Sequence, residues 1–177
     1  MKFELQPSLR VLEATPATVR ALLTNAGEPW IHNNYGKDTF SPFDVVGHFI
    51  HGEKADWIPR LERLLQYGES REFDAFDRFA QFKDSQGKSI HDLLDEFTIL
   101  RAESLRKLNA ASITNDKLQL RGKHPTLGTV TLENLLATWV VHDLNHISQI
   151  TRAMAYQYKA EVGPWRAYLG ILQSFQS

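Results

Sequence analysis

Two histidines stand four residues apart in the apolar stretch WVVHDLNHISQI, residues 139–150. Positions i and i+4 of a helix lie one turn apart on the same face, so the imidazoles of His142 and His146 could bind one metal ion. The same spacing also fits two core histidines whose ring nitrogens are hydrogen-bonded to neighbouring groups. This stretch alone leaves both interpretations open.

Two polar neighbours of this pair could take part in the same chemistry. HDLNH matches the H-E-x-x-H pattern of zinc proteases with Asp143 in place of the glutamate that acts as general base. Aspartate is one methylene shorter, and Asp143 falls inside the apolar arc of the expected helix, so the pattern favours a supporting, hydrogen-bonded carboxylate over a catalytic base. Gln149 lies at the edge of that arc beside His142 and could hydrogen-bond to a ligand histidine or to a bound water.

A catalytic metal commonly takes three protein ligands and keeps one position open. The chain has no cysteine, so a third ligand must be His, Asp or Glu. His32 and His124 stand in polar segments and are expected to be exposed, and His91 falls in the first turn of an expected helix. In VVGHFIHGEKADW, residues 45–57, small residues beside His48 leave space, which favours it over His51 as a ligand.

The acidic residues of that same segment are expected to contribute less to the metal site. Glu53 lies far from His48 around the helix, and Asp56 lies nearer, where it could support the site. For both, a solvated helix face is the favoured interpretation, which leaves no strong general base.

Four main helices are expected to position these residues, over 15–27, 41–66, 89–110 and 131–158. Thr15 is predicted to be the N-cap of the first helix, with Pro16 at its first position. Ser41 is predicted to begin the second helix, with Asp44 in its first turn. Pro59 predicts a kink or break within the second helix.

The segments between and after these helices are expected to be short or irregular. Residues 71–89 should form a loop with at most a helical turn, and the linker around Leu118 and Leu120 could hold a short extended pair. A short final helix is expected over residues 164–175.

Helices without runs of alternating strands predict an all-α fold, a four-helix bundle formed by one domain over residues 1–177. The two long connections, about 20 residues each, are too long for a simple up-down-up-down bundle. We therefore expect either crossover connections or loops that surround the entrance of an active site. Residues 30–40 and 116–130 are the expected entrance loops.

Composition excludes several classes of function. The net charge is −1, and basic residues are scattered, so nothing indicates nucleic acid or an anionic membrane surface. The apolar runs are too short for a bilayer span. The first residues carry charges and a proline where a signal peptide needs an apolar stretch, so a cytoplasmic protein is expected.

Two long segments resemble a known family. SPFDVVGHFIHGEKADWIPRLERLL and HPTLGTVTLENLLATWVVHDLNHISQI are similar to the DinB-like superfamily, which includes the YfiT-type metal-dependent hydrolases. Its pattern is one histidine early in the second helix, then H-x-x-x-H and x-x-Q in the fourth. The resemblance therefore implies His48, His142 and His146 as ligands of a divalent metal ion, usually nickel or zinc, with Gln149 beside them.

The resemblance implies less about the reaction. Members of this superfamily include thiol S-transferases that use low-molecular-weight thiols and a mycothiol-dependent isomerase, and homodimers are common. The expected function is a metal-dependent enzyme, a hydrolase or thiol S-transferase, acting on a small molecule. The alternative is a non-catalytic metal-binding or helical interaction protein on the same fold.

Overall fold

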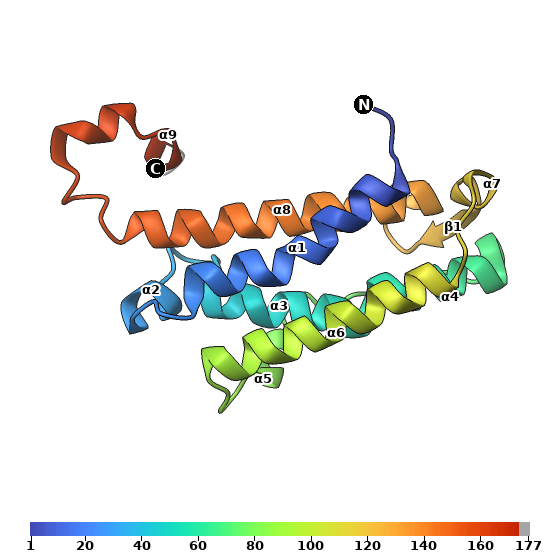
Figure 1. Cartoon of the computed structure of the whole chain (residues 1–177), viewed down its shortest axis with the longest axis horizontal. Helices are drawn as coiled ribbons and strands as arrows, with labels where there is room; N and C mark the ends of the chain where they lie inside the picture. The colour runs from blue at the N-terminus through green and yellow to red at the C-terminus, as the bar shows by residue number, and fades with distance from the viewer. Residues whose placement is uncertain (174–177) are drawn as a thin grey trace.

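The structure, a computed structural model, describes residues 1–173, and helices make up most of them (Figure 1). The long helices are α1 (Leu5–Leu23), α3 (Pro42–Ala55), α4 (Trp57–Tyr67), α6 (Ile90–Ala110) and α8 (Leu132–Tyr156). The short ones are α2 (Glu28–His32), η1 (Gly68–Ser70), α5 (Ala80–Asp84), α7 (Asn115–Leu118), η2 (Gly163–Tyr168) and α9 (Gly170–Gln173). Strands β1 (Arg121–His124) and β2 (Gly128–Thr131) form one antiparallel hairpin.

The long helices form a four-helix bundle, in which α3 and α4 together make one broken helix. This arrangement confirms the expected fold class. α1 and α8 run in one direction, and α3, α4 and α6 run in the other (Figure 1). α1 packs against α6 and α8, and α3 packs against the same two helices. Because α3 and α6 are parallel neighbours, the chain must return along the bundle between them, through residues 68–89. This segment is the expected crossover, whereas the connection before α8 instead holds the hairpin.

Capping interactions fix where the helices begin. The Ser41 side chain accepts the Asp44 N–H at 3.2 Å, and the Asp44 carboxylate accepts the Ser41 N–H at 2.9 Å. Ser89 and Thr131 begin α6 and α8 with the same reciprocal arrangement. The predicted starts of these three helices are confirmed, because each cap satisfies backbone donors locally.

The predicted start of the first helix is wrong. α1 begins at Leu5, and Thr15 lies inside it, where its hydroxyl donates to the Val11 carbonyl at 3.2 Å. Leu9 and Leu12 are both buried on the same face as the later apolar residues. Burial of this extended apolar stripe outweighs the local signal of a threonine followed by a proline.

Pro16 is tolerated within α1 because another helix supplies the missing hydrogen bond. Proline has no N–H, so the Leu12 carbonyl loses its partner in the helix. The Arg101 guanidinium of α6 donates to that carbonyl at 2.8 Å. A local defect in α1 is thereby joined to the centre of the bundle.

The predicted break near Pro59 is confirmed. It falls at Asp56, which separates α3 from α4 with φ −116° and ψ −75°. Pro59 cannot donate to the Ala55 carbonyl, so a continuous helix is unfavourable there. The break turns Asp56 away from the helical path of α3.

Two local predictions need adjustment. The predicted pair of short strands exists, but its strands, β1 and β2, lie within residues 121–131. Leu118, which was expected near this pair, is instead the last residue of α7. The final segment forms η2 and α9 rather than one helix, and residues 174 and 175 of the predicted helix lie outside the described residues.

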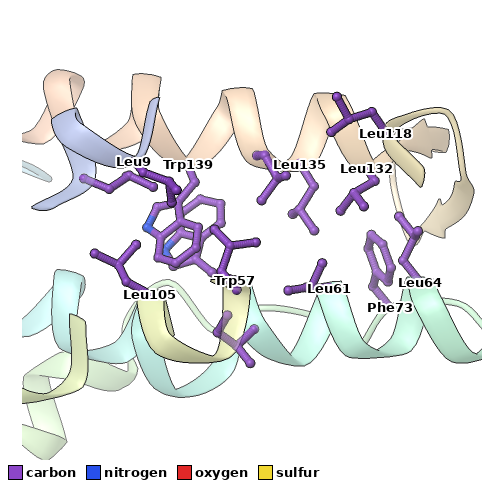
Figure 2. Packing of buried hydrophobic residues seen from close by; sticks show 14 residues of the cluster. Leu9, Trp57, Leu61, Leu64, Phe73, Leu105, Leu118, Leu132, Leu135 and Trp139 are labelled. Carbon is purple, nitrogen blue, oxygen red and sulfur yellow. The ribbon is translucent and has the colours of Figure 1, made fainter. Parts of the chain in front are cut away.

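The core consists of two apolar clusters with a polar layer between them. One cluster contains Trp57 stacked on Trp139, with ring centroids 5.5 Å apart (Figure 2). The other contains Phe49 stacked on Phe97, at 4.9 Å. Four of the five long helices, α1, α3, α6 and α8, contribute a buried polar residue to this layer: Thr15, Glu53, Arg101 and Asp143. Within residues 1–173, no helix has the length and apolarity needed to cross a bilayer.

Candidate metal centre

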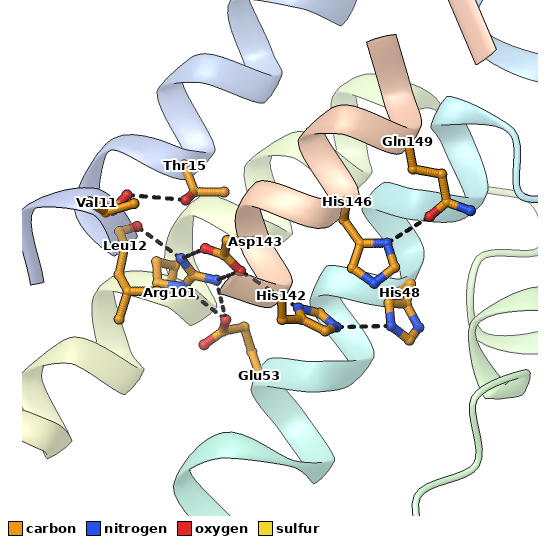
Figure 3. A network of polar contacts seen from close by, with 10 residues as sticks. All are labelled: Val11, Leu12, Thr15, His48, Glu53, Arg101, His142, Asp143, His146 and Gln149. Atoms are coloured by element: carbon orange, nitrogen blue, oxygen red, sulfur yellow. Dashed lines mark hydrogen bonds and ion pairs between the residues drawn. The ribbon is translucent and has the colours of Figure 1, made fainter. Parts of the chain in front are cut away.

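α3 and α8 bring three imidazoles together beside the polar layer (Figure 3). One ring nitrogen from each of His48, His142 and His146 lies within 4.8 Å of the other two. The Nε2 atoms of His48 and His142 are 3.1 Å apart. Two nitrogens that bind one metal ion at about 2.1 Å with tetrahedral angles would be about 3.4 Å apart. The spacing of this pair is therefore already close to that of a metal site.

The protonation of the cluster also suits a metal ion. Burial, followed by the neighbouring His146 and His142, lowers the pKa of His48 to about 3. Burial, followed by His142, lowers the pKa of His146 to about 4. Both rings are thus neutral at pH 7, and neutral imidazole is the form that binds metals.

A glutamine orients one of the rings. Nδ1 of His146 lies 2.8 Å from Oε1 of Gln149 (Figure 3). A carbonyl oxygen can only accept, so this contact places the proton on Nδ1 and leaves the Nε2 lone pair available. Gln149 contacts His146 rather than His142, its nearest neighbour on the helical wheel.

Asp143 points away from the cluster into the polar layer. Arg101 donates to both of its carboxylate oxygens, at 2.5 and 3.1 Å, and Oδ1 of Asp143 lies 3.8 Å from Nδ1 of His142. A carboxylate held by a bidentate guanidinium is a poor base. The geometry therefore favours the supporting role for Asp143.

Glu53 shares the same arginine, and its predicted exposure is wrong. Its carboxylate is buried and accepts the Arg101 Nε–H at 2.8 Å. Burial outweighs the charge of Arg101 and raises the pKa of Glu53. Burial acts in the same direction on Asp143, but contacts with His142 and Arg101 outweigh it and hold the pKa of Asp143 below its usual value. Two buried carboxylates thus depend on one guanidinium.

A cavity of about 450 Å³ opens beside the three histidines. Phe40 comes from the first expected entrance loop, whereas Trp30 packs on Tyr158 instead. His124 and Leu127 come from the second expected entrance loop. The crossover supplies a third wall that the sequence did not indicate, with the residues Phe73, Phe76 and Arg78.

Two residues of the cavity wall were expected to be solvated, and the structure corrects both. Asp56 is buried and paired with Arg60, Nε to Oδ1 at 2.6 Å, because the break before α4 turns it inward. Burial raises the pKa of Asp56 against the effect of Arg60. His124 is half-buried on the hairpin and faces the same cavity.

The other histidines do not join the cluster. His32 is exposed beside Glu28, and His91 is exposed at the start of α6. His51 packs on Phe76, with ring centroids 4.7 Å apart. Of the candidates for a third ligand, only His48 faces the pair on α8.

Sequence reasoning missed two buried residues next to the cluster. Gln81 of α5 packs against α3 at Gly47, where an added Cβ would lie 2.5 Å from Ser85 Oγ. That glycine lets the crossover approach His48. Arg101 could have been found, because it follows Leu94 and Phe97 on the inner face of α6, where an apolar residue is expected.

A helical bundle that presents three imidazoles to a cavity defines a class of candidate metalloproteins. The sequence profile of the DinB superfamily matches residues 11–150, and the chain belongs to this superfamily. Among solved structures, it is similar to YfiT from Bacillus subtilis, described as a probable metal-dependent hydrolase with an unusual four-helix bundle topology. The TM-score is 0.73, at 21% identity over 86% of each chain. No curated protein matched the sequence.

Acidification is expected to destabilise the metal-free protein through these histidines. The folded-state pKa values of His48 and His146 lie below the usual 6.5, so the unfolded chain binds more protons below pH 6.5. Stability present above pH 6.5 is therefore lost as the pH falls toward 4. Urea unfolding with a chelator should show a loss of up to about 6 kcal/mol between pH 7 and pH 4, about 3 kcal/mol from each of these two groups.

The matched comparison is the double variant His48→Gln, His146→Gln. Glu53 and Asp56 have raised pKa values and act in the opposite direction, but they do so in both proteins. The wild type should therefore lose more stability than the variant over this range. Equal losses would contradict the assignment of neutral, buried imidazoles.

Replacing Gln149 is expected to weaken metal binding without abolishing it. Gln149→Leu removes the acceptor that holds the His146 ring, and loss of such a partner typically costs about 10–100-fold in metal affinity. Competition with a chromogenic chelator measures this ratio. Gln157→Leu, the same change at the residue that caps the C-terminus of α8, is the control and should leave affinity unchanged.

Proposed function

We propose that this chain is a divalent-metal-dependent hydrolase of small molecules, with His48, His142 and His146 as the metal ligands. The observation that carries the proposal is the convergence of three imidazoles on a cavity large enough for a small substrate. The likeness to YfiT, described as a probable metal-dependent hydrolase, supports the same class of reaction.

The ligand set suits hydrolysis because it is uncharged. His48, His142 and His146 would leave a bound divalent ion its full charge, so the ion would supply Lewis acidity toward a bound water or a substrate carbonyl. Gln149 holds the His146 ring, and the polar layer supports His142. Apolar side chains of the cavity, including Phe40 and Phe76, restrict access of bulk water.

The test is a comparison of metal-free and reconstituted protein on a panel of small esters and amides. Hydrolysis should be absent after chelation and return with zinc, nickel or another divalent ion. It should not return in the reconstituted His142→Ala variant. Equal turnover by metal-free protein, or by the variant, would overturn the proposal.

The more specific expectations from the sequence remain predictions. They include nickel or zinc as the metal, a homodimer, a cytoplasmic location and a single domain over residues 1–177. Transfer to a low-molecular-weight thiol is the alternative reaction, since a thiolate could also occupy the open position. Adding thiols to the same assays distinguishes transfer from hydrolysis, and metal binding without any turnover would indicate a non-catalytic protein.

A further inference from the structure

One face of α8 carries a polar stripe along the cavity. Asn134, Thr138, His142, Asn145 and Gln149 recur every third or fourth residue, which places them on one side of the helix. Thr138 and Asn145 are exposed, line the cavity and make no side-chain hydrogen bond within residues 1–173. Hydrogen-bonding groups are therefore available to a substrate on both sides of His142.

Arg78 lies in the wall that the crossover contributes. It lines both the main cavity and a second hollow of about 250 Å³, and these two spaces also share Asn145 and His146. Arg78 is exposed, and its guanidinium lies 5.1 Å from the centre of the Phe79 ring. It forms no ion pair within the described part of the chain. The adjacent Asp77 carboxylate accepts the Phe79 N–H instead.

The charges around the cavity favour an anion. Asp56 is the only carboxylate among the residues that line it in the described chain, and Arg60 already neutralises this group. Arg78 therefore adds an uncompensated positive charge at the junction next to His146. A divalent ion held by the three imidazoles would add further positive charge to the cavity.

We infer that the substrate is a small carboxylate whose acidic group binds Arg78 and the Asn145 amide while its reacting group reaches the three histidines. A guanidinium matches a carboxylate through two parallel N–H donors, and an amide N–H can add a third. The body of the substrate lies against Phe40, Phe73 and Phe76, so it carries apolar atoms. This inference rests on the proposed metal-dependent function and specifies its substrate class.

The experiment uses cobalt-loaded full-length protein and hydroxamates, which bind an open metal position. The probes are the monohydroxamates of succinic, glutaric and adipic acid, each compared with its uncharged methyl ester. Binding is followed through the visible absorption of the cobalt. At least one acid should bind about five-fold more tightly than its ester, because an exposed charge pair contributes modestly.

Two arginine variants locate the effect. Arg78→Gln should abolish the preference for the acid, whereas Arg71→Gln should preserve it. Arg71 is a matched control, since it is exposed on the same connection, lies over the Tyr67 ring and does not line the cavity.

The possible failures are distinguishable. If cobalt binds but every acid binds no more tightly than its ester, the inference of a carboxylate substrate is wrong, whereas the proposed metal site is supported. Preservation of the preference in Arg78→Gln would also overturn the inference. If the protein takes up no cobalt, the proposed function and the inference both fall.

Discussion

Replacing His142 by alanine is expected to reduce metal affinity by at least about 100-fold, so that the dialysed protein retains almost no metal. The variant leaves two imidazoles, His48 and His146, where a stable site takes three or four protein ligands. His142 lies at the edge of the core, so the fold should survive the change. Elemental analysis of untagged protein after dialysis measures the metal-to-protein ratio.

His51→Ala is the control for this experiment. His51 lies one turn from His48 on α3, but it packs on Phe76 and stands outside the cluster. The control should bind metal as the wild type does. Full metal content in His142→Ala, or loss of metal in His51→Ala, would contradict the ligand assignment.

Arg101→Met is expected to be the most destabilising single substitution in the polar layer, by about 3–5 kcal/mol. Arg101 is 1% exposed and pairs with Glu53 and Asp143, which are also buried. Its removal leaves two carboxylates without a counter-ion, and it leaves the Leu12 carbonyl without a donor. Urea unfolding of the metal-free protein measures the loss.

An exposed arginine provides the comparison. Arg20 of α1 pairs with Asp95 of α6 at 2.6 Å, but both side chains are solvent-accessible. Exposed pairs contribute about 0–1 kcal/mol, so Arg20→Met should cost far less. Similar losses in the two variants would show that the buried network does not stabilise the bundle.

This network explains why the candidate metal centre and the fold are linked. Asp143 follows His142 directly in α8, and its carboxylate is fixed by an arginine that also binds α1 and α3. The position of α8 relative to α3 therefore depends on Arg101. That relative position determines whether His48 meets the pair on α8.

Local signals in the sequence predicted much of this arrangement. Ser41 and Thr131 were correctly expected to begin helices, because a capping box involves residues only three positions apart. Pro59 likewise predicted the break, since its missing N–H affects its own helix. The i, i+4 spacing of His142 and His146 placed both on one face, as the structure shows.

Long-range pairing could not be predicted in the same way. Glu53 looked like a solvated residue because its partner, Arg101, is 48 positions away in the chain. Asp56 looked exposed because its burial depends on how the break before α4 turns it. His48 became a strong candidate only through the family resemblance, since a single histidine on a helix does not show which helix it faces.

The most direct test of the metal centre is a crystal structure of the metal-loaded protein with anomalous diffraction measured at the absorption edge of the metal. We expect one strong peak, about 2.0–2.3 Å from the Nε2 atoms of His48, His142 and His146. A peak bound elsewhere on the chain, or a His48 ring turned away from the peak, would contradict this expectation.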